Sequence, residues 1–410
     1  MIKKFVNSFK NIGPGPLIAA AIIGPGTVTL CTVSGAYFGL SLLWAVLFSV
    51  IAAIILQEMS VRVGMITQKS LTQVLREVLK HPVLKSLVFI LILAAILVGN
   101  TAYEAGNISG GVLGMETITG EWRLTMGSLS INGISLLLGG IAFVLLYIGN
   151  YKVLERVLVV LVLLMSLSFL TTAILTKPNI IDVMKGLFGF SIPEDSFITI
   201  IGLVGTTIVP YNLFLHSSLV KEKWTKKTDL KVATRDMVMA MIVSGVISLS
   251  IIISAAASPL KEVENATSLA QGLEPLFGVF AKYFLGIGLF AAGLTSAVTA
   301  PLAAAYVASG CFGWKDQLTS KKFRLIWILV LVLGVFISSL GIKLITVIQF
   351  AQVTNGIILP LIAIVLLWIM NKKSVFGKHK NSIIQNIFGV IIVIFTLFIG
   401  AKSIISVFNS

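Results

Sequence analysis

Long apolar stretches alternate with short polar segments along the whole of this chain of 410 residues. A helix needs roughly 20 consecutive apolar residues to cross the hydrocarbon core of a bilayer, and the pattern contains eleven stretches of about that length. We therefore expect an all-α polytopic membrane protein, because only helices and closed barrels satisfy their backbone hydrogen bonds in lipid. The expected spans are 15–39, 41–66, 84–112, 131–149, 153–176, 196–220, 237–257, 275–312, 325–341, 344–370 and 383–408.

Two of these stretches need a comment. The stretch 275–312 is longer than a span requires and contains Gly and Pro, which suits either one long tilted helix or a broken one. We count it once. The N-terminal sequence MIKKFVNSFK precedes apolar residues as in a signal peptide, but further spans follow directly, so we expect a retained first helix.

Composition supports a membrane location, since 57% of the residues are hydrophobic, only 11% are charged, and the mean hydropathy is +1.02. The two cysteines, Cys31 and Cys311, lie in apolar stretches without the neighbours of a metal or redox motif. The sequence shows no nucleophile–base arrangement, Gly-rich phosphate loop or Cys and His cluster. We therefore expect neither an enzyme nor a bound cofactor.

The distribution of positive charge predicts the orientation, because Lys and Arg accumulate in cytoplasmic loops. If the N-terminus is cytoplasmic, 24 of the 31 Lys and Arg residues fall in cytoplasmic segments and seven fall outside. We therefore predict a multi-pass protein of the plasma membrane with an extracellular C-terminus. The formal net charge of +15 follows from this topology and requires no nucleic acid as a partner. The lipid bilayer is the expected partner, and no obligate protein partner is evident.

Two spans are interrupted near their middle. The breaks are Gly24-Pro25-Gly26-Thr27 in the first span and Val209-Pro210-Tyr211-Asn212 in the sixth. Non-helical backbone at this depth is tolerated only where protein or a water-filled cavity satisfies it. Because each interrupted span opens a set of five, we predict a single transmembrane domain, 1–410, made of inverted repeats at 14–176 and 196–371 with an additional span at 383–408. The two breaks would then face each other and form a substrate site, whereas a proline kink without function is the alternative.

The first ten spans resemble the NRAMP family of transition-metal transporters. The resemblance rests on IGPGPLIAAAIIGPGTVT and GAYFGLSLLWAVLFSVIAAIILQEMSVRVGMITQKSL in the first two spans, VPYNLFLHSSLV in the sixth and AQVTNGIILPLIAI in the tenth. It implies the leucine-transporter-like fold of the amino acid–polyamine–organocation superfamily and a divalent metal ion as substrate. Members of the family usually carry Asp-Pro-Gly-Asn in span one and Met-Pro-His-Asn in span six, and the Asp, the Asn and the Met ligate the metal.

This chain keeps the helix breaks of the family but changes the ligands. Gly24 and Thr27 replace the Asp and the Asn, whereas Val209 and Tyr211 replace the Met and the His. The formal negative charge is lost, and so is the soft thioether that favours manganese, iron or cadmium. The predicted metal site therefore consists of neutral side chains, backbone carbonyls and open space. Its residues are Ala21, Gly24, Thr27, Thr206, Val209, Tyr211, Asn212 and Gln352.

Neutral oxygens in a roomy cavity suit an ion that arrives with its waters, and Mg²⁺ dehydrates reluctantly and prefers oxygen ligands. The altered site resembles that of the NRAMP-related magnesium transporters. This resemblance implies import of partly hydrated Mg²⁺, and of Mn²⁺ as a second substrate, by alternating access. Two alternatives remain open: a proton-coupled manganese or iron transporter of the same family, and an amino-acid transporter of the same superfamily.

The resemblance also predicts that coupling to protons is absent or weak. In proton-coupled members the Asp of span one, a His of span six and acidic residues of span three take part in coupling. Here the first two are Gly24 and Tyr211, and the third span keeps only Glu104, with Thr101 where an Asp is expected. Glu104 and His216 are candidates for the transport path, because an ionisable residue inside a membrane is functional by default. A buried, hydrogen-bonded structural role is the alternative for each.

Overall fold

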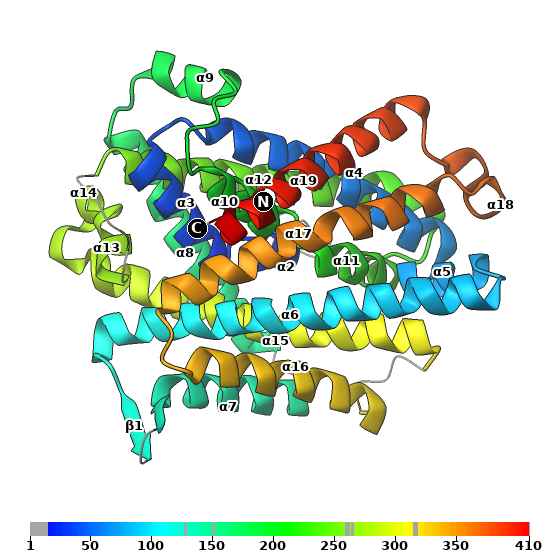
Figure 1. Ribbon diagram of the computed structural model, residues 1–410, viewed down its shortest axis with the longest axis horizontal. Helices are drawn as coiled ribbons and strands as arrows, with labels where there is room; N and C mark the ends of the chain where they lie inside the picture. Colours follow the sequence, from blue (N-terminus) through cyan, green and yellow to red (C-terminus); the bar gives the residue numbers. More distant parts are fainter. Residues whose placement is uncertain are drawn as a thin grey trace, which may run out of the picture.

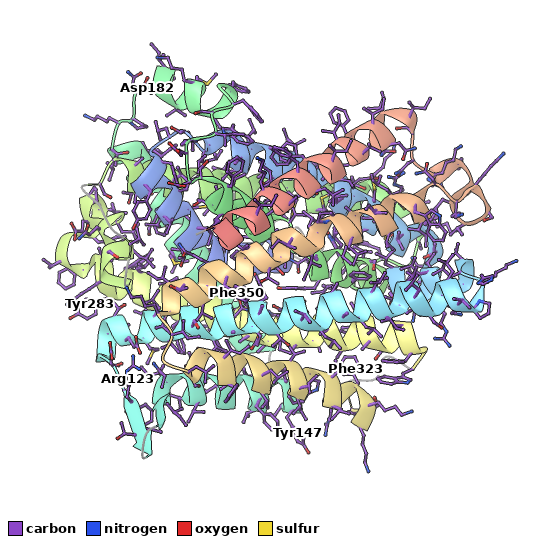
Figure 2. All side chains as sticks on the ribbon, viewed as in Figure 1. Arg123, Tyr147, Asp182, Tyr283, Phe323 and Phe350 are labelled. Carbon is purple, nitrogen blue, oxygen red and sulfur yellow. The ribbon has the colours of Figure 1, made fainter. Side chains whose placement is uncertain are left out.

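The computed structural model describes residues 15–126, 129–149, 152–258, 263, 266–314 and 319–409. Residues 1–14, with three of the basic residues used to predict the orientation and the first residue of predicted repeat 1, lie outside this part. The described chain is almost entirely helical, apart from a two-stranded hairpin (Figure 1). Side chains fill the spaces between the helices (Figure 2).

Most of the predicted spans correspond to single long helices. These are α4 (Leu43–Thr67), α6 (Pro82–Thr119), α8 (Lys152–Leu175), α12 (Leu230–Ala256), α15 (Ala281–Phe312), α16 (Lys321–Ser339), α17 (Leu344–Met370) and α19 (Ile383–Asn409). The shorter helix α7 (Gly133–Ile148) occupies the fourth predicted span. The first predicted span is divided into α2 (Gly15–Ile22) and α3 (Pro25–Phe38), and the sixth into α10 (Phe197–Thr207) and α11 (Pro210–Lys223).

Short elements form the connections between these helices. They are α5 (Leu71–Val78), α9 (Ile180–Phe188), α13 (Ala266–Gln271), α14 (Glu274–Phe277), α18 (Lys373–Phe376), the 3₁₀ turns η1 (Lys227–Asp229), η2 (Gly278–Phe280) and η3 (Gly377–His379), and the strands β1 (Arg123–Met126) and β2 (Leu129–Asn132). The strands pair antiparallel, with Arg123 opposite Asn132. Asn132 also caps α7, because its side-chain oxygen accepts from the backbone N–H groups of Ile134 and Ser135.

The predicted all-helical membrane architecture is confirmed. Among the described residues nine helices are long and apolar enough to cross a membrane, with α10 and α11 taken together as one. The number eleven stays a prediction, because α2 and α3 are each too short to span alone and α7 has 16 residues. The division into two repeats and the orientation of the termini also stay predictions.

The structure adds three details to the predicted spans: the length of the third, the continuity of the eighth, and a hairpin between the third and the fourth. The third span, expected at 84–112, continues as helix to Thr119, because its polar end stays helical beyond the apolar stretch. The eighth span is unbroken from Ala281 to Phe312, and Pro301 lies inside the helix. The hairpin between α6 and α7 was not expected from the sequence.

Glycines allow α6 and α15 to pack backbone to backbone, side by side along the long axis of the molecule (Figure 1). A Cβ atom added to Gly286 would lie 2.7 Å from the carbonyl oxygen of Gly114, and one added to Gly293 would lie 2.6 Å from the backbone nitrogen of Gly111. Such small-residue contacts are typical of helix packing in membranes. Gly110 of α6 in turn lies against the ring of Pro25. The break in the first span therefore packs against α6, one helix of this closely packed pair.

Candidate functional site

The break between α2 and α3 is made by a proline. Pro25 has no N–H group, so the carbonyl of Ala21, four residues earlier, cannot receive the usual helical hydrogen bond. Ile23 and Gly24 are non-helical, and Gly24 adopts an extended backbone conformation before α3 begins (φ −91°, ψ −177°). Two residues of the predicted metal site therefore lie at the break: Ala21, whose carbonyl oxygen is a candidate ligand, and Gly24, which has no side chain.

The break between α10 and α11 has the same construction. Pro210 cannot donate to the carbonyl of Thr206, which is again four residues earlier. Ile208 and Val209 are non-helical, and the helix resumes at Pro210. The two carbonyls that the sequence predicted as ligands are thus the two that proline deprives of a helical partner.

Thr27 joins the two breaks. Its hydroxyl lies 2.8 Å from the hydroxyl of Thr206 and also donates to the carbonyl of Ile22, the last residue of α2. Both threonines are buried. Residues from three of the four half-helices therefore meet at one point, and their role as a substrate site stays a prediction.

Gln352 of α17 lies beside this meeting point of the two breaks. A Cβ atom added to Gly26 would collide with the side-chain amide of Gln352, and one added to Gly205 would collide with its backbone carbonyl. Gln352 therefore sits between α3 and α10, in the space that these two glycines leave. Its side-chain oxygen is buried and has no hydrogen-bond partner within the described part of the chain.

The first turn of α11 carries the other predicted residues. Val209 and Tyr211 are fully buried, and the ring of Tyr211 meets that of Tyr103 on α6 edge to face, with 5.4 Å between centroids. The side chain of Asn212 is also fully buried. Neither amide atom of Asn212 makes a hydrogen bond to the residues that the structure describes, and the hydroxyl of Tyr211 lies near those of Tyr103 and Thr299. Buried polar atoms normally have partners, so the amide of Asn212 is available to a ligand or to water.

Glu104 is buried in α6, and its stem packs against α16. Its Cβ and Cγ atoms occupy the notch left by Gly334 of α16. One carboxylate oxygen accepts a long hydrogen bond of 3.5 Å from Asn107, and the other has no partner among the described residues. The structure therefore places this acid between α6 and α16 rather than among the predicted metal ligands.

His216 is fully buried in α11 and is bound to a neighbouring helix. Its Nδ1 atom lies 2.8 Å from the side-chain oxygen of Gln57 on α4, so Nδ1–H donates to that oxygen. The other ring nitrogen, Nε2, is buried without a partner in the described structure. The sequence interpretation missed Gln57, although a polar amide within an apolar span is a usable signal.

The site as a whole is neutral. The residues that meet at the breaks supply hydroxyl, amide and backbone carbonyl oxygens. No group of three or more His, Cys, Asp and Glu side chains able to hold a metal occurs among residues 15–126, 129–149, 152–258, 263, 266–314 and 319–409. Such a site can coordinate a cation through oxygen dipoles and can accommodate water, but it offers no side-chain charge.

Two interrupted helices that meet at buried polar groups, in an all-helical membrane chain, define the class of leucine-transporter-like membrane transporters. Solved structures support the fold. The structure resembles a manganese transporter of Eremococcus coleocola with a TM-score of 0.74, at 21% identity, covering 97% of this chain and 86% of that one. It also resembles MhsT in complex with L-phenylalanine, with a TM-score of 0.59 at 15% identity, covering 96% and 98%.

The particular family is shown by the sequence. Residues 15–406 match the family model Nramp, described as natural resistance-associated macrophage protein-like, so this chain belongs to the Nramp family. Relatives include the divalent metal cation transporters MntH of Caldanaerobacter subterraneus subsp. tengcongensis, 26% identical over 97% of this chain and 93% of the relative, and of Bacillus subtilis, 27% identical over 93% and 88%. The metal transporter nramp1 homolog of Dictyostelium discoideum is 27% identical over 94% and 73%.

Proposed function

We propose that this protein carries divalent metal ions across a membrane by alternating access, with Mg²⁺ as the main substrate and Mn²⁺ as the second. The names of its relatives support the substrate class, since they are divalent metal cation transporters. The choice of Mg²⁺ within that class rests on one observation: Thr27, Thr206 and Gln352 bring only neutral groups to the helix breaks.

The chemistry of these groups favours a hydrated ion. Without a carboxylate or a thioether, the site cannot compensate a transition metal for the loss of its inner water shell. Mg²⁺ keeps several of its waters in proteins and takes oxygen ligands. The unpartnered amide of Asn212 and the side-chain oxygen of Gln352 would hydrogen-bond those waters. In this proposal Gly24, which has no side chain, takes up no space that those waters need.

The membrane potential can drive such a transporter without protons. One elementary charge that crosses 100 mV contributes about 2.3 kcal/mol, so a divalent ion gains roughly 4.6 kcal/mol. Since 1.4 kcal/mol corresponds to a factor of ten, that energy sustains a gradient of the order of a thousandfold. In this proposal the protein is an importer in the plasma membrane with its N-terminus in the cytoplasm, and the metal ion is its cargo.

A second function, proton-coupled transport of manganese, is favoured by a different observation. Glu104 and His216 each keep a buried titratable atom without a partner in the described chain, and such atoms can carry protons. One solved structure similar to this one is named a manganese transporter. Under this alternative, metal entry would acidify the inside of a vesicle.

Uptake into proteoliposomes distinguishes the two functions. Vesicles with an internal magnesium or manganese reporter and an internal pH reporter are given an inside-negative potential. The proposal predicts Mg²⁺ entry at constant internal pH and little entry of Ca²⁺. Entry of manganese or cadmium without Mg²⁺, or acidification that follows the amount of metal, would reject it.

Two neighbouring threonines provide a matched pair of variants. Thr206→Val removes a hydroxyl that meets Thr27 at the breaks, and Thr207→Val removes one that bonds within its own helix to the carbonyl of Leu203 at 2.8 Å. Metal flux should fall in the first variant and stay near the wild-type value in the second. Equal flux in both variants would show that the breaks do not form the substrate site.

A further inference from the structure

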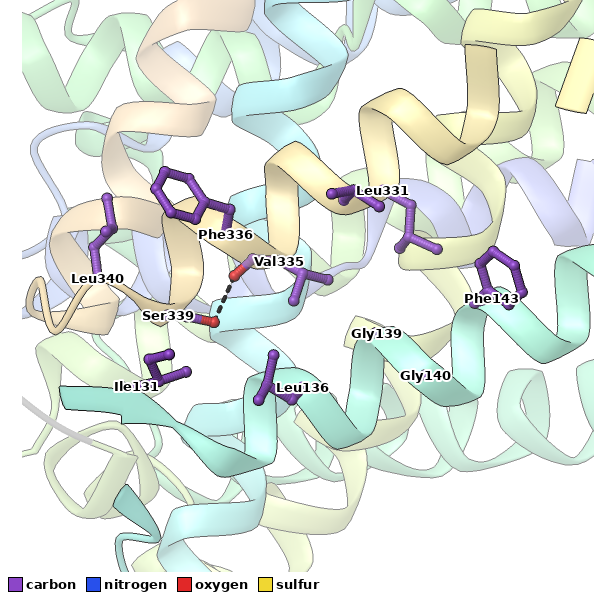
Figure 3. Close-up of a pocket in the computed structure, with 11 residues that line it drawn as sticks. Ile131, Leu136, Gly139, Gly140, Phe143, Leu331, Val335, Phe336, Ser339 and Leu340 are labelled. Carbon is purple, nitrogen blue, oxygen red and sulfur yellow. Dashed lines mark hydrogen bonds between the residues drawn. The ribbon is translucent and has the colours of Figure 1, made fainter. Parts of the chain in front are cut away.

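An apolar groove lies on the surface between α7 and α16 (Figure 3). Its volume is about 610 Å³, within the 300–1,000 Å³ typical of ligand pockets. Gly139 and Gly140 of α7 form part of its lining, and side chains such as Leu136, Phe143 and Phe336 flank it and are exposed. A Cβ atom added to Gly140 would meet nothing within 4 Å. The groove is therefore open at the position where α7 has no side chain.

The side chains that line the groove are almost all apolar. Ser339 contributes a hydroxyl, which donates to the carbonyl of Val335 at 2.6 Å, and the other lining residues are apolar or glycine (Figure 3). A polar ligand would lose its hydration here without gaining hydrogen bonds. The groove therefore suits a hydrocarbon chain.

The length of the groove matches one leaflet of a bilayer. On α16 its lining extends from Leu331 to Leu340, and nine residues of helix rise about 14 Å. The hydrocarbon core of a bilayer is about 30 Å thick, so half of it is about 15 Å. Since Leu136, Phe143 and Phe336 on the rim of the groove are exposed on two apolar helices, an acyl chain of a single leaflet would fill the groove from its end to mid-depth.

Two cations lie at the outer end of the groove, beyond Leu340. Nη1 of Arg123 lies 3.5 Å from the position that a Cβ atom on Gly341 would take, and Lys343 follows two residues later. Arg123 uses its Nε atom to bind Glu121 at 3.0 Å. Both partners of that pair are exposed, so the interaction is weak, and the guanidinium keeps other donors for a second acceptor. The other acid at this end, Glu116, accepts from Asn132 at 2.7 Å and also interacts electrostatically with Arg123. Lys343 has an interaction partner of its own, so a phosphate would be an additional acceptor for both cations.

We propose that this groove is a phospholipid site, in which one acyl chain lies between α7 and α16 and the phosphate is bound by Arg123 and Lys343. The charge of the phosphate complements these cations, and the chain complements the apolar lining. Figure 2 places Arg123 at the hairpin, beside one end of the helix pair. With the predicted orientation, the lipid belongs to the outer leaflet. This inference does not depend on the transported ion.

Retention of lipid after purification tests the site. The protein in mild detergent is incubated with phosphatidylglycerol and then washed with detergent that contains no lipid. The phospholipid that stays bound is extracted and quantified per protein chain. We expect about one retained lipid in the wild type. Gly140→Leu should abolish retention, because its side chain fills the open groove while Leu favours the helix more than Gly does. Val144→Leu is the control, since Val144 is exposed on the same helix but does not line the groove.

The head group is tested separately. Arg123→Gln combined with Lys343→Gln should lower retention several-fold while leaving the fold intact, because both side chains are exposed. Retention in Gly140→Leu equal to that of the wild type would overturn the proposal. A wild-type dimer that Gly140→Leu converts to a monomer, without any loss of lipid, would also overturn it and would assign the groove to a second copy of the chain.

Discussion

Replacement of Gly205 by Ala tests whether the two sides of the site must be in backbone contact. A Cβ atom at this position would lie 2.7 Å from the nitrogen of Gly356 and 3.0 Å from the carbonyl carbon of Gln352, and closer still to the oxygen of that carbonyl. All three atoms belong to the backbone of α17. No side chain can move to relieve the contact, so α10 and α17 must separate.

The size of the effect follows from these distances. Ordinary contact at 3.4 Å requires a displacement of about 0.7 Å at Gly356 and more at Gln352. Overpacking of this kind costs typically 1–3 kcal/mol, whereas Gly→Ala within a helix stabilises by roughly 0.5–1 kcal/mol. The net loss of stability should therefore be about 1 kcal/mol and at most about 2.5 kcal/mol. Metal flux should fall as well, because Gln352 moves away from Thr206.

Gly202→Ala is the matched control, one turn earlier on the same helix. Its added Cβ atom would also lie 2.7 Å from its nearest neighbour, but that neighbour is a terminal methyl of Leu30, which can rotate. Thermal stability of the detergent-solubilised variants, followed by size-exclusion chromatography after heating, compares the two, and proteoliposome uptake gives the flux. A Gly205→Ala protein that is as stable as Gly202→Ala and transports normally would refute the reasoning.

Three further predictions concern charge and hydrogen bonding. Gly24→Asp should strengthen cadmium binding and reduce Mg²⁺ flux, because it adds a charged ligand and occupies space needed for water. Calorimetry measures the cadmium affinity, and uptake measures the Mg²⁺ flux. A folded variant with the metal preference of the wild type would contradict the proposal. Arg62→Ala should destabilise the protein by about 3–5 kcal/mol, since the Arg62 side chain is 6% exposed and pairs with the carboxylate of Glu58 at 2.6 Å. Lys69→Ala is the control, because it removes an exposed ion pair worth at most about 1 kcal/mol. Similar melting temperatures of the two variants would argue against this difference. Gln57→Leu should cost about 1–3 kcal/mol by leaving Nδ1 of His216 unpaired, and the cost should shrink in a His216→Phe background, which a double-mutant cycle would show.

The sequence predicted the helices well because a bilayer permits few alternatives. Apolar stretches had to become helices. Pro25 and Pro210 each remove a backbone donor where a helix is interrupted, but Pro301 and Pro360 lie inside continuous helices, so a proline alone does not determine a break. The extension of α6 to Thr119 and the hairpin at Arg123 were not predicted. Both lie outside the apolar stretches, where hydropathy carries no information about secondary structure.

The candidate site was predicted in part. The contact of Thr27 with Thr206 and the position of Gln352 agree with the expected cluster. The directions of Glu104 toward α16 and of His216 toward α4 could not be read from the sequence. These helices are buried on several sides, so hydrophobic periodicity does not identify which neighbour each face meets. The contact between Glu104 and Gly334 forms only when α6 and α16 pack together, so the sequence alone does not reveal it.

The polarity of the broken helices explains how a site without charged side chains can still favour a cation. The carboxyl ends of α2 and α10 meet near the bond between Thr27 and Thr206, and helix carboxyl ends carry partial negative charge. Prolines 25 and 210 increase this effect, because they leave the carbonyls of Ala21 and Thr206 without helical donors. Under the proposed function, the backbone therefore supplies the electrostatic preference for cations, and the residues at positions 24, 27 and 209 determine how much water the cation keeps. Substitutions there should change which metal is carried, whereas replacement of either proline should weaken the binding of every metal.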